Sequence, residues 1–205
     1  MLLANNIYFK RDNREILNNV SLTISARKII HLTGNNGIGK TTLLKILTNI
    51  LIPEKGEIFW NGRNIKKNIF DFYKEVTFIM DKETSNKSLT VNENIKFWRK
   101  LFSSQISSKE INSILELLSL DKYKNTLTSY LSHGEIKKFE LSRLIIEQKK
   151  LWILDEPYLG LDQLSIKIIN QTIINHIELG GMVIFTSHVS PNIPNLEILN
   201  LNKNE

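Results

Sequence analysis

The chain has 205 residues, of which 41% are hydrophobic and 23% are charged, so it can bury a core and is not a disordered tail. It contains no cysteine, which excludes disulfide bonds and cysteine-ligated zinc or iron–sulfur sites and fits a reducing compartment. The formal net charge is +6, but the lysines are scattered and form no run typical of nucleic-acid binding. We therefore expect no nucleic-acid partner.

No segment of the sequence has the pattern of a targeting signal or a membrane span. Residues 1–10 lack the charged and then apolar regions of a signal peptide. The apolar runs are far shorter than the roughly 20 residues needed to cross a bilayer. We expect a chain that is soluble by itself and that reaches a membrane only by docking to another protein.

Strand-like and helical patterns alternate in the first part of the chain. Residues 28–33 form a short apolar run, and residues 40–51 carry apolar side chains at helical spacing. Pro53 and Gly56 are expected to end that helix. Residues 56–60 are predicted to form a strand that enters a tight turn at Asn61-Gly62, and residues 76–80 are predicted to form another strand.

The middle of the chain is predicted to be helical, and strands return after it. Capping boxes at Thr90 with Glu93 and at Ser107 with Glu110 indicate two helix starts between residues 88 and 148. Three strand-like runs and one helix follow, at residues 151–154, 182–186 and 196–201 and at residues 163–178. This order predicts one α/β domain over residues 1–205, with a mainly parallel core at about 1–83 and 151–205 and a helical subdomain at about 84–150.

The first chemical motif lies directly after the strand at 28–33. It fits the phosphate-binding loop G-x-x-x-x-G-K-[ST], in which glycines allow the backbone to turn its N–H groups toward phosphate oxygens. Lys40 is expected to reach the β- and γ-phosphates, and the Thr41 hydroxyl is expected to bind Mg²⁺. The predicted nucleotide-binding residues are Gly34, Asn35, Asn36, Gly37, Ile38, Gly39, Lys40, Thr41 and Thr42.

The second motif is an apolar strand that ends in two carboxylates, Asp155 and Glu156. On its own this pattern is a common strand end. Together with a phosphate loop it resembles a Walker B segment, whose strand is expected to lie next to the phosphate loop. Asp155 is then expected in the Mg²⁺ shell, through a water molecule, and Glu156 is expected to activate the attacking water.

The third motif is Leu131-Ser132-His133-Gly134-Glu135, which precedes a helical pattern. Ser132 and Glu135 form a capping box. The segment also resembles the LSGGQ signature of the ATP-binding subunits of ABC transporters. The two interpretations are compatible, because a capped helix N-terminus is suited to meet a phosphate.

The resemblance to this family covers nearly the whole chain and adds further residues in the family's order. Gly160-Leu161-Asp162 resembles the D-loop, and His188, at a strand end, resembles the histidine that contacts the γ-phosphate. The resemblance implies a P-loop NTPase fold with an N-terminal antiparallel β portion and a helical subdomain. It also implies a transport-coupled ATPase that uses ATP and Mg²⁺, with Glu156, His188 and Lys40 as catalytic residues.

The resemblance also implies partners. Two copies of such a subunit hold ATP between them, so that Ser132, Gly134 and Glu135 of one copy face the nucleotide of the other. Integral membrane subunits carry the transported substrate, which places the chain peripherally at the cytoplasmic face of the inner membrane. The length of 205 residues leaves room for one cassette, so the second cassette and the membrane-spanning half are expected from other chains.

Two positions depart from the family pattern. The aromatic residue that stacks on adenine is replaced by Arg11, whose guanidinium plane could stack on the base instead. The Q-loop glutamine is absent, and the best match is Lys82. A lysine cannot bind Mg²⁺ through an amide oxygen, so this position puts the coupling to a membrane subunit in question.

Within the family, three segments look like the ATPase subunit of the cytochrome c maturation haem exporter. They are residues 11–14, residues 151–157 and residues 180–184. The resemblance implies haem export, or release of a haem chaperone, as the process that the ATPase powers. The alternatives are the ATPase of another small ABC exporter and a nucleotide-dependent switch that hydrolyses slowly.

Overall fold

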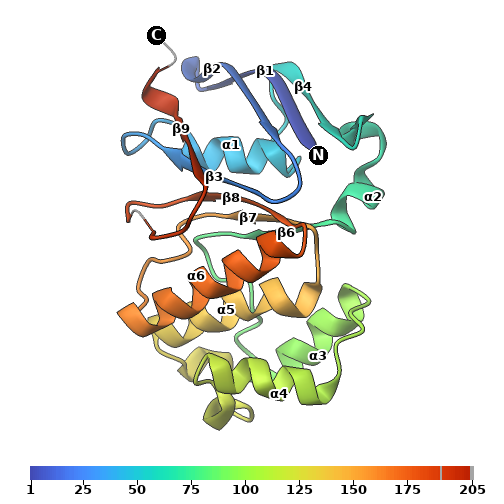
Figure 1. The fold of residues 1–205 in the computed structure, drawn as a ribbon, viewed down its shortest axis with the longest axis vertical. Helices are drawn as coiled ribbons and strands as arrows, with labels where there is room; N and C mark the ends of the chain where they lie inside the picture. The colour runs from blue at the N-terminus through green and yellow to red at the C-terminus, as the bar shows by residue number, and fades with distance from the viewer. Residues whose placement is uncertain (190, 204–205) are drawn as a thin grey trace.

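A computed structural model describes residues 1–189 and 191–203 (Figure 1). Two sheets form its frame. A four-stranded antiparallel sheet has the order β2-β1-β4-β5, and a five-stranded parallel sheet has the order β6-β7-β8-β3-β9. The strands are β1 Leu2–Arg11, β2 Arg14–Ile24, β3 Lys28–Thr33, β4 Lys55–Trp60, β5 Arg63–Asn64, β6 Val76–Ile79, β7 Leu151–Leu154, β8 Met182–Thr186 and β9 Leu196–Asn200.

The helices separate the sheets and cover the free face of the parallel sheet. Figure 1 shows α1 between the two sheets, α5 and α6 below the parallel sheet, and α3 and α4 below these. The helices are α1 Lys40–Leu47, α2 Ile69–Tyr73, α3 Val91–Leu101, α4 Ser108–Leu117, α5 His133–Glu147 and α6 Gln163–Glu178. None of the helices in the described part of the chain has the length and hydropathy of a membrane span.

Side chains alternate between the two faces of the parallel sheet, as strand geometry requires. On β7, Leu151 and Ile153 pack toward α1 and the antiparallel sheet, whereas Trp152 and Leu154 pack toward the lower helices. The parallel sheet therefore separates two apolar clusters, one on each of its faces. The sequence at β7 reads as a continuous apolar run because both faces of this strand are covered.

The expected elements are present, with small differences at their ends. The first helix ends at Leu47, before the expected residue 51, because Asn49 takes a positive φ and the amides of Ile50 and Leu51 both donate to the carbonyl of Lys45. The capping boxes at Thr90 and Ser107 open α3 and α4. The expected α/β fold class, with an antiparallel N-terminal portion, is confirmed.

The sequence predicts that the end of β7 lies next to the phosphate loop, and it makes no prediction about which strands are neighbours in the parallel sheet. The Walker B strand β7 does not lie beside the strand β3 that leads into the phosphate loop, because β8 pairs with both and separates them. Chain order alone does not give the order of strands in a parallel sheet, since each crossover can pass over a neighbour. The end of β7 lies next to the loop as expected, since Asp155 Oδ1 accepts from the Thr41 hydroxyl and from the hydroxyl of Thr186, the last residue of β8.

Candidate functional site

The loop after β3 has the backbone conformation that its glycines allow. Gly34, Gly37 and Gly39 all have positive φ, and Gly39 is the N-cap of α1 with φ 109°. A Cβ at Gly39 would lie 2.9 Å from the Ile16 and Leu17 side chains and 3.1 Å from the Ile16 carbonyl oxygen. Gly39 therefore lets the loop pack directly against β2.

The Lys40 side chain folds back over this loop. It is 9% exposed, and its Nζ donates to the carbonyl oxygens of Gly34, at 2.7 Å, and Asn35, at 3.2 Å. The Asn35 amide in turn donates to the Asn202 side chain at 3.1 Å, which ties the loop to the segment after β9. The expected residues 34–42 thus form one continuous turn around a buried lysine, with Thr42 half-buried in α1.

Asp155 joins the loop to the ends of the parallel strands. Its Oδ1 accepts from the Thr41 hydroxyl at 3.1 Å and from the Thr186 hydroxyl at 2.8 Å. Thr186 Oγ1 also accepts from the Glu156 amide at 3.0 Å. These bonds bring the first turn of α1, the end of β7 and the end of β8 together at one point, although the three residues are far apart in the sequence.

Glu156 follows Asp155 in a strained conformation and faces His188. Its φ is +47°, in the left-handed region that costs a non-glycine residue about 1–2 kcal/mol. Its Oε2 accepts from the His188 amide at 3.3 Å, and its Oε1 lies 3.6 Å from His188 Nε2. Strain of this kind is held in place by the surrounding structure and is common at functional sites.

The oxygen donors present suit a hard divalent cation better than a transition metal. The Thr41 hydroxyl oxygen and the Asp155 Oδ1 lie 3.1 Å apart, beside the loop at residues 34–42. Among residues 1–189 and 191–203, no group of three or more His, Asp or Glu side chains could form an all-protein metal site. A hydroxyl and a carboxylate side by side fit Mg²⁺, which binds through one or two protein oxygens and substrate phosphates.

The signature segment opens α5 as a capping box and packs against the D-loop. Glu135 Oε2 accepts from the Ser132 amide at 2.8 Å and from the Ser132 hydroxyl at 2.7 Å. A Cβ at Gly134 would lie 3.0 Å from the Gly160 carbonyl oxygen. Asp162 is the N-cap of α6 and accepts from the Ser165 amide at 2.7 Å. In the described residues, no hydrogen bond or ion pair joins this segment to the loop at 34–42.

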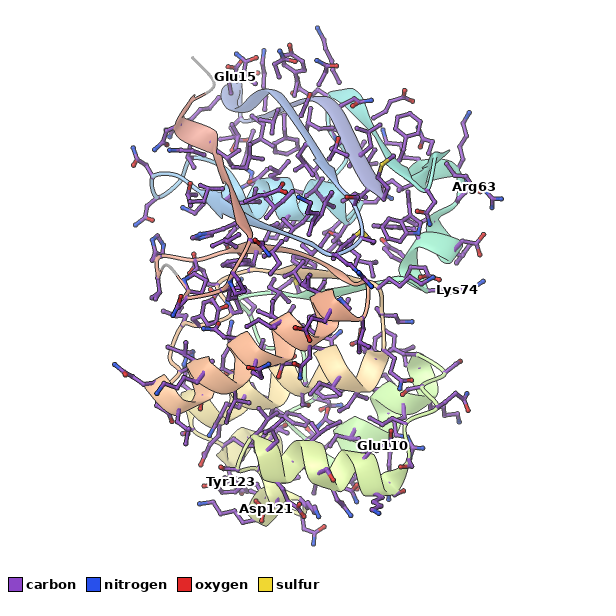
Figure 2. The ribbon with its side chains drawn as sticks, viewed as in Figure 1. Glu15, Arg63, Lys74, Glu110, Asp121 and Tyr123 are labelled. Carbon is purple, nitrogen blue, oxygen red and sulfur yellow. The ribbon has the colours of Figure 1, made fainter. Side chains whose placement is uncertain are left out.

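The environment of Glu135 favours its charged form. Hydrogen bonds from the Tyr123 side chain and from Ser132 lower the pKa of Glu135. Tyr123 lies at the end of the molecule farthest from the antiparallel sheet, beside Asp121 (Figure 2). The N-terminus of α5 is therefore held from below by the segment that follows α4.

The two residues that depart from the family pattern are both exposed. Arg11 lies at the end of β1, opposite Arg14 in the hairpin that continues into β2. Figure 2 shows Glu15 of this hairpin at the end of the molecule where the C-terminal segment also lies. Lys82 lies in the loop after β6. The hairpin packs on the loop at 34–42 through Ile16 and Leu17 of β2.

The sequence analysis missed a set of buried charged residues on α5. They are Lys137, Glu140, Arg143 and Glu147, each at most 9% exposed. Burial lowers the pKa of Lys137, whereas the nearby carboxylates of Asp81, Asp155, Glu140 and Glu156 raise it. Burial also raises the pKa of Glu147, against the effect of Arg143. They follow one another at a spacing of three, three and four residues, which puts them on one side of a helix. This spacing was the feature of the sequence that could have indicated them.

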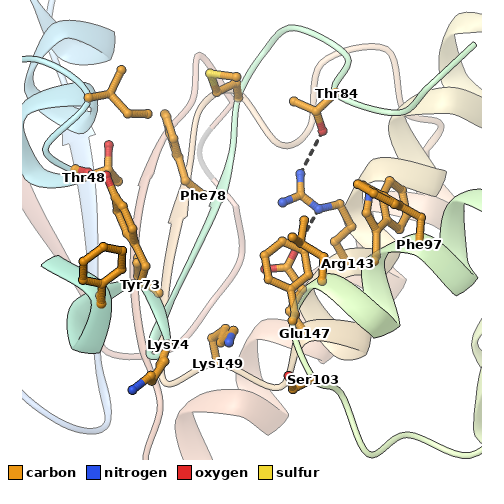
Figure 3. Close-up of a pocket in the computed structure, with 17 residues that line it drawn as sticks. Thr48, Tyr73, Lys74, Phe78, Thr84, Phe97, Ser103, Arg143, Glu147 and Lys149 are labelled. Atoms are coloured by element: carbon orange, nitrogen blue, oxygen red, sulfur yellow. Dashed lines mark hydrogen bonds and ion pairs between the residues drawn. The ribbon is translucent and has the colours of Figure 1, made fainter.

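A groove lies between the sheet and the helices α3 and α5. Its volume is about 920 Å³, and its sides include exposed aromatic residues, Phe70 and Tyr73 from α2 and Phe97 from α3. Figure 3 shows Tyr73 and Phe78 on one side, Phe97 on the other, and Arg143 between Thr84 and Glu147 at the base. The groove is separate from the phosphate loop, and no residue of 34–42 lines it.

The histidines other than His188 pack against neighbouring side chains and backbone. His31 stacks on Phe185 with ring centroids 4.6 Å apart, and its Nε2 lies 3.0 Å from the Ser187 carbonyl oxygen. His176 stacks on Trp152, and burial lowers its pKa to about 4. His133 packs over Gly160 at the signature. His31, His133 and His176 therefore lie in three different parts of the molecule and do not form one cluster in the described residues.

Comparison of the sequence with known proteins finds a family model and curated relatives that match most of the chain. The family model for the ABC transporter matches residues 17–159. The cytochrome c biogenesis ATP-binding export protein CcmA of Dechloromonas aromatica is 33% identical over 194 residues, which cover 95% of each chain. The protein of the same name from Reclinomonas americana is 35% identical over 204 residues, which cover 98% of this chain and 90% of the relative.

Solved structures give the same result for the fold. A putative ABC transporter ATP-binding protein from Pyrococcus furiosus superposes with a TM-score of 0.84 at 27% identity and covers 98% of both chains. A dimeric ATP-binding cassette bound to ADP and phosphate has a TM-score of 0.76 at 20% identity and covers 92% of this chain and 88% of that one, which supports the fold alone. The family match and the curated relatives show that the chain belongs to the ABC transporter family, as an ATP-binding subunit.

Proposed function

We propose that this chain hydrolyses ATP as the transport-coupled ATPase subunit of an export complex that serves cytochrome c biogenesis. The observation that carries the proposal is the bonded set at the strand ends, in which Asp155 accepts from Thr41 and Thr186 while Glu156 faces His188. This arrangement supports the proposal, because one carboxylate could bind a cation and the second could activate water beside a glycine-rich loop.

Each residue of this set has a proposed role. The amides of residues 34–42 and the Lys40 ammonium bind the phosphates of ATP, and Arg11 stacks on the base. Glu156 takes the proton of the attacking water, and His188 holds the γ-phosphate. Thr41 and Asp155 would hold Mg²⁺, with Asp155 acting through a water molecule, and Mg²⁺ would neutralise charge on the phosphates. Lys82 stands at the Q-loop position.

The second half of the site is proposed to come from another copy of the chain. Within residues 1–189 and 191–203, no hydrogen bond or ion pair joins Ser132, Gly134 or Glu135 to the phosphate loop, and the α5 N-terminus is capped and partly exposed. A helix N-terminus carries partial positive charge and free amides, so it suits the γ-phosphate held by the partner copy. Asp162 caps α6 two residues after Gly160, whose carbonyl oxygen lies close to Gly134, and it is proposed to contact the partner as well.

The names of the relatives support the proposed cargo and location. The curated relatives are named as cytochrome c biogenesis ATP-binding export proteins. We propose haem, or release of a haem chaperone, as the process that is powered, with this chain bound to integral membrane subunits at the cytoplasmic face of the membrane. Residues 84–150 are proposed to act as a helical subdomain that moves with the membrane partner.

The groove beside α3 is the proposed docking surface for a membrane subunit. Phe70, Phe97 and Leu101 are more than half exposed there, and Lys74 and Lys149 lie at its sides. An amphipathic helix with an apolar face and acidic flanks fits this lining. Phe97→Asp is expected to release the chain from membranes that contain its transporter. Ile198→Asp, at an exposed apolar residue on β9 outside the groove, is the matched control, and equal release by both would contradict this docking site.

The proposed activity is tested by steady-state ATP turnover of the full chain with Mg²⁺, with and without Glu156→Gln. Loss of turnover in the variant, with ATP binding retained, is the expected result because the substitution removes the base and leaves the loop intact. Negligible turnover in the wild-type chain, with ATP-dependent association retained, would instead favour the slow switch. The exposed Lys82 in place of the Q-loop glutamine is the observation that keeps this second function open.

A further inference from the structure

Thr186, the last residue of β8, is a buried polar residue without a role in the proposed function. Its exposed fraction is 0%, and its strand lies between β3 and β7 in the parallel sheet. A buried hydroxyl costs free energy unless it is hydrogen-bonded, so native structures give such groups partners. The partners of Thr186 therefore show what this residue connects.

The Thr186 hydroxyl bonds to two neighbouring residues of the site at once. It donates to Asp155 Oδ1 at 2.8 Å and accepts from the Glu156 amide at 3.0 Å. The direction of each bond is fixed, because an ionised carboxylate can only accept and a backbone N–H can only donate. One side chain of β8 thus holds both of the residues that follow β7.

The bond to Asp155 comes from the sheet and does not involve the phosphate loop. Asp155 Oδ1 also accepts from the Thr41 hydroxyl at 3.1 Å, but Thr41 lies in the first turn of α1, directly after that loop. Strands β7 and β8 pair as far as Leu154 and Phe185, the residues just before Asp155 and Thr186. This pairing sets the distance between the carboxylate and the Thr186 hydroxyl.

The bond to Glu156 acts on a strained part of the backbone. Glu156 has a φ of +47°, and φ is the rotation about the bond from its amide nitrogen to its Cα. The bond from this amide to Thr186 therefore fixes the peptide plane on one side of the strained rotation. Such conformations persist only where the surrounding structure holds them. Thr186 supplies one of the contacts that do so.

The segment that begins at Thr186 also contacts the side chain of Glu156. The His188 amide donates to Glu156 Oε2 at 3.3 Å. Between the two residues, the Ser187 carbonyl oxygen lies 3.0 Å from Nε2 of the buried His31 of β3. The segment is therefore held from the side of β3 while it contacts the residues after β7 from the other side.

We propose that Thr186 is a positioning residue for ATP hydrolysis, because its hydroxyl holds the Asp155 carboxylate and the Glu156 backbone in the arrangement that the reaction uses. Thr186 acts through these two residues and not by contact with the nucleotide. The proposal rests on the proposed ATPase function and adds a residue to it. Removing a hydrogen-bond partner of a cation-binding side chain typically costs about 10–100-fold in activity or cation affinity.

The test compares Thr186→Val and Thr186→Ser with Thr77→Val in the full chain. Valine keeps the branched shape and removes the hydroxyl, whereas serine keeps the hydroxyl. Thr77 of β6 is the matched control, since it is 1% exposed and its hydroxyl donates at 2.7 Å to a buried carboxylate outside the site, that of Glu147. The measurements are kcat and KM for ATP, the affinity for a fluorescent ATP analogue with and without Mg²⁺, and the thermal midpoint.

Thr186→Val is expected to lower kcat by about 10–100-fold and to weaken the effect of Mg²⁺ on analogue affinity, because the Asp155 carboxylate is no longer held. Analogue affinity without Mg²⁺ should stay within about twofold of the wild type, since the phosphate loop is unchanged. Thr186→Ser should regain most of the turnover. Thr77→Val should keep the wild-type kcat, although both valine variants should have a lower thermal midpoint because each leaves a carboxylate without a donor.

Two results would overturn the inference. The first is a Thr186→Val variant whose kcat and response to Mg²⁺ equal those of the wild type. The second is a loss of kcat that Thr77→Val shares in proportion to its thermal midpoint, or that Thr186→Ser does not recover, either of which would give Thr186 a structural role only. Failure of the proposed function is recognised separately, in the wild-type chain, as the lack of any turnover that Glu156→Gln removes, and this inference would then fail with it.

Discussion

The phosphate loop and helix α5 differ in the partners of their buried charged side chains. In the loop, one lysine is surrounded by backbone groups of its own short segment, since Lys40 bonds to the carbonyls of Gly34 and Asn35. In α5, charged side chains are buried against residues 50 or more positions away, as Glu140 is against Thr84 and Ser85. The first arrangement depends on glycine stereochemistry, and the second depends on long-range packing.

This difference indicates how each region would fail. A loop built from the backbone is sensitive to an added Cβ and to loss of its one cation. A helix layer with buried titratable groups is sensitive to loss of a partner and to pH. Substitutions can therefore separate the two regions.

Lys40→Ala is expected to reduce ATP turnover by at least about 100-fold, because the loop loses its only side-chain cation for the phosphates. The free energy of unfolding should change little, since Lys40 bonds only to carbonyls of the neighbouring loop. Turnover and ATP affinity that match the wild type would show that the loop does not bind the phosphates.

Gly39→Ala is expected to lower the free energy of unfolding by about 1–3 kcal/mol, because the residue has φ 109° and its Cβ would collide with Ile16 and Leu17. Gly37→Ala is the matched control: its φ of 80° is also positive, but a Cβ there meets no atom within 4 Å. Urea unfolding gives the free energy of unfolding of both variants. The loss in Gly37→Ala reports the cost of the positive φ, and the additional loss in Gly39→Ala reports the collision. Equal losses would mean that the close approach to β2 contributes nothing.

In the helical layer, His176 predicts a dependence of stability on pH. Burial lowers its pKa from 6.5 to about 4, so the folded state favours the neutral imidazole. As pH falls below 6.5, the unfolded state binds a proton that the folded state does not, and the free energy of unfolding decreases until about pH 4. Between pH 7 and 5 we expect this residue to account for a loss of about 1–2 kcal/mol.

His176→Phe keeps the stacking on Trp152 and removes the titration. Urea unfolding at pH 7 and at pH 5 should show a smaller decrease for this variant than for the wild type. His133→Phe, at an exposed histidine, should keep the wild-type decrease. The same decrease in all three proteins would contradict the burial of a neutral His176.

The features that could be predicted from the sequence are local in the chain. The phosphate loop, the capping boxes at Thr90, Ser107 and Ser132, and the helix at 163–178 each depend on residues within a few positions of one another. The convergence of Thr41, Asp155 and Thr186 is different. The family resemblance implied a link between Thr41 and Asp155, but no spacing indicated Thr186.

The remaining features depend on packing that the sequence does not display. The position of β8 between β3 and β7 follows from the crossovers, which residue patterns do not specify. Lys137 and Lys138 look like part of a scattered surface charge, yet Lys137 is buried. The charged residues Lys137, Glu140, Arg143 and Glu147 of α5 have the spacing of a solvated helix face. Only the packing of the loop at 81–86 shows that this face is covered.

The central claim is that the loop of one copy and the α5 N-terminus of another form one hydrolytic site. It is tested by mixing two variants, Lys40→Ala, which retains Ser132, and Ser132→Ala, which retains Lys40. Each variant alone should have little turnover, whereas the mixture should exceed the sum of the two, because a mixed pair contains one complete site. Ser107→Ala, which removes an equivalent cap from α4, should stay active alone. An active Ser132→Ala variant, or a mixture no faster than its parts, would contradict the claim.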